Sequence, residues 1–223
     1  MRGTGFNSGG PNATILTMDW DYFYPVSYYL QIVEGVRPDV TVISGALLKF
    51  PWYYDYLEKR YPGSLTGSYA SINSFLEQAR ALERSRSLEP ADPEAYDLGL
   101  IEVTRRIVWG RYPASPVYVL SNDIDPVAVP GTTLLPIGLV LQLSPDSSAT
   151  PPRDLKLTFH SLLENRTESE AIRDQYANAY LNIGIYWARH GDRLAASRNI
   201  AKALTLRPQL PEALEWQRNL GWL

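Results

Sequence analysis

Two short acidic stretches of the sequence combine carboxylates with aromatic or amide side chains. The segment DWDY places two carboxylates beside two rings, and the segment NDID repeats the carboxylate spacing further along the chain. Carboxylates suit Mg²⁺ or Mn²⁺ and could bridge such an ion to a diphosphate, while a neighbouring ring suits one face of a sugar. The candidate ligand-binding residues are Asp19, Trp20, Asp21, Tyr22, Asn122, Asp123 and Asp125.

A structural interpretation of the same residues competes with the binding one. One acid would cap the helix that follows, and the others would face water. Under this interpretation the protein binds no cofactor and no metal. A divalent cation is the alternative. We expect the strands that precede the two stretches to be neighbours, because their acidic ends would then share one rim of the sheet.

Composition excludes several functional classes. The chain has no Cys, which excludes a thiol nucleophile, a zinc finger and disulfides. Neither His160 nor His190 stands in a recognisable nucleophile context, so no catalytic residue is predicted. The net charge of −3 comes without a long basic run, which argues against a nucleic-acid partner. No apolar stretch reaches the roughly 18 residues needed to cross a bilayer.

The acidic stretches follow predicted strands of an α/β domain. ATILTM, residues 13–18, reads as a buried strand, and a helix follows with Pro25 at its first position and Gly35 as its C-cap. Apolar residues recur in this helix at helical spacing: Val26, Tyr29, Leu30 and Val33. RPDVTVIS then predicts a second strand, parallel to the first.

The rest of this domain is predicted from similar signals. Helices are expected over residues 51–62, 71–85 and 93–110, with Asp92 as the N-cap of the last. Residues 115–123 predict a third strand, and residues 131–143 contain a fourth. The fold class is therefore α/β, with a small, three-layer, mostly parallel sheet of Rossmann-like type.

The C-terminal region predicts a helical hairpin of tetratricopeptide-repeat (TPR) type. A 34-residue pattern places Gly191 and Asp192 in the turn, and small residues where the two helices approach. The packing residues of the pattern are Tyr180, Ile183, Gly184, Trp187, Ala196, Ile200, Ala203 and Pro208. A plain helical hairpin is the alternative, and EAIRDQYAN is expected to add a separate helix before the pattern.

The predicted organisation has four parts. They are a flexible leader over 1–12, the α/β domain over 13–146, a linker over 147–158 and the helical TPR-like region over 159–223. One repeat cannot bury its own apolar face, so the helical region must pack on a neighbouring element.

A set of residues in the first third of the chain resembles a known family. The set is Asp19, Asp21, Pro25, Tyr28, Gln31, Glu34, Gly35, Arg37, Pro38, Asp39, Val40, Leu47, Leu48, Trp52, Tyr53, Tyr61 and Pro62. It is similar to the segment that follows the membrane spans in the protein O-mannosyltransferase-like family, polytopic membrane proteins that look like C-type glycosyltransferases. The resemblance extends over roughly residues 12–210, and many such proteins end in TPRs.

The resemblance implies an extracytoplasmic domain cut from, or encoded apart from, a larger membrane protein. The spans that would carry a transferase site are absent here, so no catalytic residue is carried over. We therefore expect a binding or accessory module whose partner is a protein or the membrane portion of its own full-length protein, with a glycan or acceptor peptide as further options. The alternative is a soluble sugar-nucleotide or cation-binding enzyme that uses the acidic strand ends.

One part of the resembling set has a structural explanation of its own. The motif comprises Glu34, Gly35, Arg37, Pro38 and Asp39. It would end the helix, turn, and enter the second strand, with Arg37 paired to Asp39 or Glu34 and with Asp39 accepting turn amides. Fold maintenance is the favoured reading of Arg37, with ligand binding as the alternative.

Overall fold

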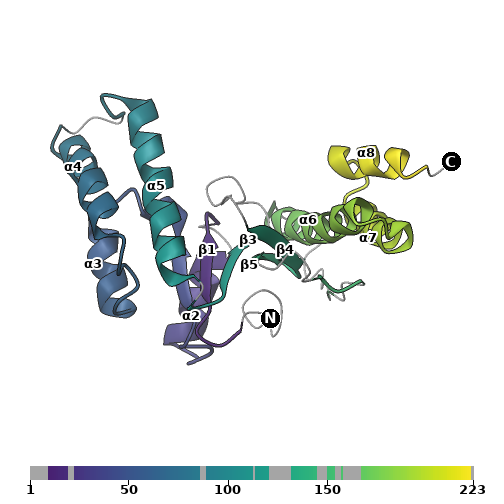
Figure 1. The fold of residues 1–223 in the computed structure, drawn as a ribbon, viewed down its shortest axis with the longest axis horizontal. Helices are drawn as coiled ribbons and strands as arrows, with labels where there is room; N and C mark the ends of the chain where they lie inside the picture. Colours follow the sequence, from purple (N-terminus) through teal and green to yellow (C-terminus); the bar gives the residue numbers. More distant parts are fainter. Residues whose placement is uncertain are drawn as a thin grey trace. The chain divides into compact units, whose positions relative to one another are not determined.

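The chain is a mixed α/β protein made of two compact units, seen here in a computed structural model (Figure 1). The structure describes residues 10–19, 23–85, 89–112, 114–120, 132–144, 150–153, 157 and 167–221. Of the described residues, those from 10 to 119 form one unit, the sheet unit, and Leu120 with those from 132 onward form the other, the helical unit. The predicted α/β fold class is confirmed in this coarser form, as a mixed α/β protein.

Three short parallel strands form the centre of the sheet unit. They are β1 (Thr14–Thr17), β2 (Thr41–Ser44) and β3 (Val117–Leu120). β1 lies in the middle, with Thr14 opposite both Thr41 and Val117. Every residue of the three strands is buried, as expected for parallel strands rich in β-branched residues and covered on both faces. The predicted β-α-β unit and the adjacency of β1 and β3 are confirmed.

Helices surround these strands and begin close to the predicted residues. They are α2 (Phe23–Ile32), α3 (Pro51–Arg60), α4 (Tyr69–Ser85) and α5 (Pro93–Arg111), with a short 3₁₀ turn, η1 (Gly45–Leu47), after β2. The Asp92 side chain accepts a hydrogen bond from the Ala95 amide at 3.0 Å, which confirms the predicted cap of α5. Helix α2 starts two residues before Pro25, and Figure 1 shows α4 and α5 side by side.

The helical unit contains a β-hairpin where the sequence predicted one strand. Strands β4 (Thr133–Ile137) and β5 (Val140–Ser144) are antiparallel, with Pro136 opposite Leu141. Gly138 makes the reversal possible because its φ of +73° lies in the left-handed region. Leu135 and Leu139 of the hairpin pack into the core of the helical unit. The hairpin therefore packs with the helices, while the predicted boundary of the α/β domain at residue 146 stays a prediction.

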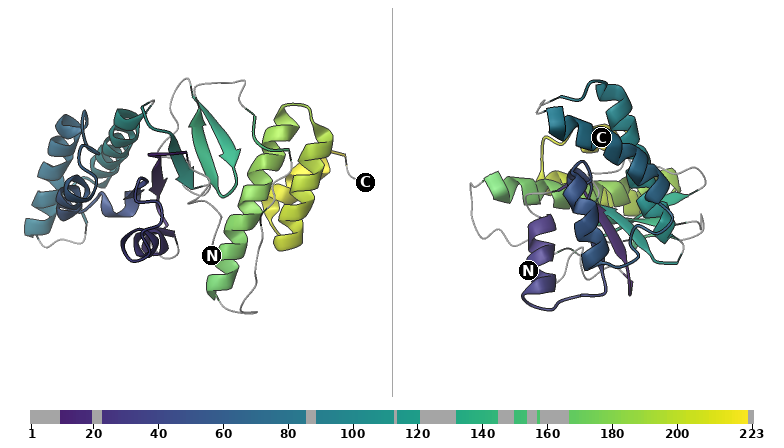
Figure 2. Two further views of the ribbon diagram at one scale, coloured as in Figure 1. Left: turned by 90° about the horizontal axis from the view of Figure 1, so that it is seen from below. Right: turned by 90° about the vertical axis from the view of Figure 1, so that its left-hand side faces the viewer.

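Three helices complete the helical unit: α6 (Thr167–Arg189), α7 (Arg193–Leu206) and α8 (Pro211–Asn219). Figure 2 shows α6 and α7 as an antiparallel pair. Gly191, with a φ of +81°, turns the chain between them, and the Asp192 side chain caps α7 through the Ala195 amide at 3.0 Å. Residues 170–178 are helical as predicted, but they form part of α6 and not a helix of their own.

Candidate functional site

The carboxyl edge of the three parallel strands is the location the sequence predicted for a ligand. Thr17, the last residue of β1, lies opposite Ser44, the last residue of β2. Because β3 is the other neighbour of β1, the carboxyl ends of all three strands lie at one edge. Ligands of open α/β sheets bind at such edges.

Asp19 is the one acid of the predicted rim that the structure describes. Its amide donates to the Thr17 hydroxyl at 2.9 Å, and its carbonyl accepts the Tyr24 amide at 3.2 Å. These bonds hold the turn from β1 into α2. Trp20, Asp21, Tyr22, Asn122, Asp123 and Asp125 lie outside the described residues. No group of three His, Asp or Glu residues within the described ranges is placed to hold a metal ion, and the rim as a ligand site stays a prediction.

A cluster of buried hydroxyls stands directly beneath this edge. Tyr53 of α3 accepts the Ser44 amide at 2.9 Å and donates to the Tyr24 hydroxyl at 3.2 Å. Burial raises the pKa of Tyr53 and of Tyr24, so both phenols stay neutral at physiological pH. The Ser44 hydroxyl oxygen is buried and, within the described part of the chain, has no hydrogen-bond partner. The cluster is therefore a neutral, polar support for the strand ends.

The motif after α2 forms a closed polar network at the amino end of β2, the end opposite to the carboxyl edge. Arg37 holds Asp39 through two contacts of 2.9 Å, and the Asn12 amide donates to the same carboxylate at 2.9 Å. Of the two partners considered for Arg37, the structure shows Asp39. The hydrogen bonds from Arg37 lower the pKa of Asp39 to about 2. Arg37 also donates to the Gly10 carbonyl at 2.8 Å, so the guanidinium ties two loops together.

Gln31 connects this loop to α2 and α3. Its amide nitrogen donates to the carbonyls of Arg37 at 3.0 Å and Val40 at 2.6 Å. Its side-chain oxygen accepts the Tyr61 hydroxyl at 2.8 Å. Gln31, Arg37, Val40 and Tyr61 all belong to the set that resembles the membrane-protein family. Their contacts support a structural role for this part of the motif.

The remaining motif residues shape the turn. Helix α2 ends at Ile32, so Gly35, predicted as its C-cap, lies in the turn beyond the helix, with a φ of +65°. Arg37 adopts a φ of +50°, which is uncommon for a residue with a side chain. Glu34 and Pro38 are exposed. The ion pair and the bond from Gln31 to the Arg37 carbonyl hold that residue in its left-handed conformation.

Helix α2 turns its polar side inward and its apolar side outward, which the sequence analysis did not predict. Its buried residues are Tyr24, Ser27 and Gln31. Its exposed residues include Val26, Tyr28, Tyr29 and Ile32, together with Val33 just beyond its end. The ten residues of the helix include no charged side chain. A polar stripe of Ser and Gln in an otherwise apolar, uncharged helix is the signal that would have indicated this orientation.

Exposed aromatic residues also occur at the start of α3, and one tyrosine of α2 packs against this helix. Tyr28 lies 6.4 Å from Tyr56, measured between ring centroids. At the start of α3, Phe50 and Trp52 stack at 6.3 Å, and Trp52 is 53% exposed. We use the name aromatic face for the following exposed residues: Val26, Tyr28, Tyr29, Ile32, Val33, Phe50 and Trp52. Large exposed apolar surfaces of this kind mark interaction sites.

The helical unit buries the residues that the repeat pattern singled out. Ile183, Ala196 and Ala203 are completely buried, and Ile200 and Trp187 are nearly so. A Cβ atom on Gly184 would lie 2.6 Å from Ile200 Cγ1, which confirms that the helices approach closely at this glycine. Tyr180 is also buried, and Pro208 follows the end of α7. The helical hairpin is thus shown, while its assignment to the TPR class is a proposal.

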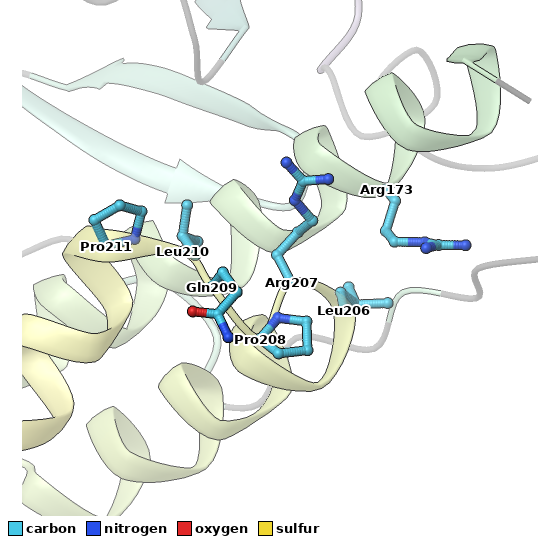
Figure 3. Close-up of a pocket in the computed structure, with 7 residues that line it drawn as sticks. All are labelled: Arg173, Leu206, Arg207, Pro208, Gln209, Leu210 and Pro211. Atoms are coloured by element: carbon cyan, nitrogen blue, oxygen red, sulfur yellow. The ribbon is translucent and has the colours of Figure 1, made fainter. Parts of the chain in front are cut away.

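A hollow of about 330 Å³ opens where α7 leads into α8 (Figure 3). Its lining residues are Arg173, Leu206, Arg207, Pro208, Gln209, Leu210 and Pro211. The two arginines point in different directions in Figure 3. Arg207 Nε lies 2.7 Å from Asp174 Oδ1, so an internal carboxylate already compensates this charge. The hollow therefore lacks a pair of convergent cations.

Comparison of the chain with protein-family models, curated proteins and solved structures finds no match. Among the described residues, no helix combines the length and the apolar character required to cross a membrane. The class that the structure defines is a mixed α/β protein with a parallel three-stranded core and a helical hairpin.

Proposed function

We propose that the chain is a non-catalytic binding module whose partner docks on the aromatic face. The observation that supports this function is the orientation of α2, whose polar residues find partners inside while its apolar residues meet water. Aromatic residues are enriched and charged residues depleted in the centres of protein interfaces. Because α2 carries no charge, the matching surface must be poor in charge as well.

From the family resemblance we propose that this module works beside a membrane protein. In that setting the chain is the extracytoplasmic domain of a glycosyltransferase-like protein, and its first candidate partner is the membrane portion of the same full-length protein. The sheet unit is then a Rossmann-like domain, and the helical hairpin is a TPR-like element that extends the binding surface. Both assignments belong to this proposal.

Site-specific cross-linking in the source cells tests the proposal. A photoreactive amino acid replaces Tyr29 on the aromatic face or, as the matched control, Leu98 on α5, which is also apolar and exposed. We expect one discrete cross-linked protein from position 29, none from position 98, and loss of the product when Val33→Asp is added. Equal products at both positions, or no product at position 29, would refute the proposal. Val33 is 65% exposed, so its substitution leaves the fold intact.

The adjacency of β1 and β3 favours a second candidate, a cation- or sugar-nucleotide-binding enzyme. This adjacency is the arrangement that the rim requires, and the buried Ser44 hydroxyl lies at the same edge. Calorimetry with millimolar Mn²⁺, Mg²⁺ and Ca²⁺ tests it. Binding that Asp19→Asn or Asp21→Asn removes would support the enzyme, and the absence of any heat would leave these acids as loop residues.

A further inference from the structure

A short segment of the chain lies across the α6–α7 hairpin and is held mainly by its backbone. Trp187 donates its indole N–H to the Pro152 carbonyl at 3.3 Å, and Asn199 donates to the Arg153 carbonyl at 2.8 Å. The Tyr180 hydroxyl accepts the Leu157 amide at 3.3 Å and lies 3.4 Å from its carbonyl oxygen. Backbone contacts of this kind would accept any extended chain of suitable shape.

One side chain of the segment, Arg153, is also bound. Its guanidinium carbon lies 5.9 Å from the centroid of the Trp187 ring, and its Nη2 lies 3.3 Å from Oδ2 of Asp192. Asp192 is already oriented because its other oxygen caps α7. A ring and a fixed carboxylate form a site for a cation. Arg153 itself is 75% exposed, so its own segment fills this site loosely.

Asn199 retains an unused acceptor next to the group that holds the segment. The residue is completely buried, and its amide nitrogen also donates to the Ala195 carbonyl at 2.8 Å. Its side-chain oxygen is buried and has no hydrogen-bond partner among the residues that the structure describes. Buried acceptors are nearly always satisfied in native proteins. A bound chain that offers an N–H group to this oxygen would satisfy it.

We propose that Trp187, Asp192 and Asn199 form a peptide-binding site, which residues 150–153 occupy in cis. The ligand is an extended segment of another protein in which an arginine follows a proline, as Arg153 follows Pro152. The carboxylate and the ring select the arginine, and the amide of Asn199 binds the backbone beside it. The inference rests on the proposed binding function, although it concerns a different element from the aromatic face.

Fluorescence anisotropy with a labelled TPPRDLKL peptide, the sequence of residues 150–157, tests the site on the full chain. The Arg153→Ala chain has a weaker internal competitor, so we expect it to bind the peptide about tenfold more tightly than the unmodified chain does. The peptide TPPADLKL should bind the same variant about tenfold more weakly. Asp192→Asn, which keeps a capping residue, should remove that difference between the peptides.

Three results would overturn the inference. They are no saturable binding to the Arg153→Ala chain, equal binding of the two peptides to that chain, and a concentration-dependent dimer of the unmodified chain that exchanges this segment. The last result would assign the site to a second copy of the chain. An intact cross-link at position 29 together with any of these results would reject this inference alone, whereas loss of that cross-link would reject the binding module itself.

Discussion

Substitution of Gly184 by Ala should destabilise the helical unit, because α6 and α7 touch at this residue. The added Cβ would lie 2.6 Å from Ile200 Cγ1 and 3.3 Å from the Ala196 carbonyl oxygen. Carbon atoms prefer separations of about 3.5–4.0 Å, so the helices must separate by roughly 1 Å. Overpacking of this kind costs about 1–3 kcal/mol, and the better helix propensity of Ala returns about 1 kcal/mol. Because the backbone of α7 also blocks the methyl group, we expect a net loss of about 1–2 kcal/mol.

Circular dichroism during thermal and urea unfolding measures this loss, and the expected Tm decrease is about 2–8 °C for a chain of this size. Hydrogen exchange at the amides of α6 and α7 localises the effect, since the two units need not unfold together. Ile200→Ala supplies the control: it removes Cγ1, costs about 2–5 kcal/mol alone, and should reduce the penalty of Gly184→Ala in the double variant. A raised Tm for Gly184→Ala, or simple additivity in the double variant, would refute the close contact of the helices.

Two further predictions concern the network around the loop after α2. The pKa of Asp39 is lowered to about 2, so its pair with Arg37 contributes stability above the unfolded pKa near 4 and loses it as the pH falls toward 2. Because the pair is partly exposed, its contribution to the free energy of unfolding should be about 0.5–1 kcal/mol, and Asp39→Asn should remove it. An NMR titration midpoint near 4 for Asp39 would contradict the pairing. Gln31→Leu should lower the free energy of unfolding in urea by about 2–3 kcal/mol, because it leaves buried carbonyls without a donor. Tyr61→Phe removes one hydrogen bond to Gln31 and should lower it by about 1 kcal/mol. Equal losses for the two variants would contradict the central place of Gln31 in the network.

Local signals in the sequence were sufficient for most elements of the sheet unit. Short β-branched runs predicted the strands, and Pro51 and Asp92 marked the starts of two helices. Left-handed Gly191 turns the chain between α6 and α7 where the sequence placed the turn. These signals work because each depends on the backbone preference of one residue and its nearest neighbours.

The division of residues 131–143 illustrates where local signals were insufficient. The run is apolar throughout, so its periodicity could not separate one strand from two. The reversal at Gly138 is stabilised by the packing of Leu135 and Leu139 against the helical unit. That contact joins residues far apart in the sequence, and it also decides to which unit the hairpin belongs.

The candidate sites divide in the same way. The sequence by itself identified Asp19 as a residue that could bind a ligand, because the acceptors of a carboxylate are a property of its side chain. Only the tertiary structure decided that Asn199 meets the carbonyl of Arg153, and that α2 faces inward with Gln31. Helical spacing identifies a helix, but the buried side is decided by which partners the rest of the chain brings. For Gln31 those partners are the carbonyls of the loop after α2 and the Tyr61 hydroxyl, which outweigh the apolar stripe on the other side.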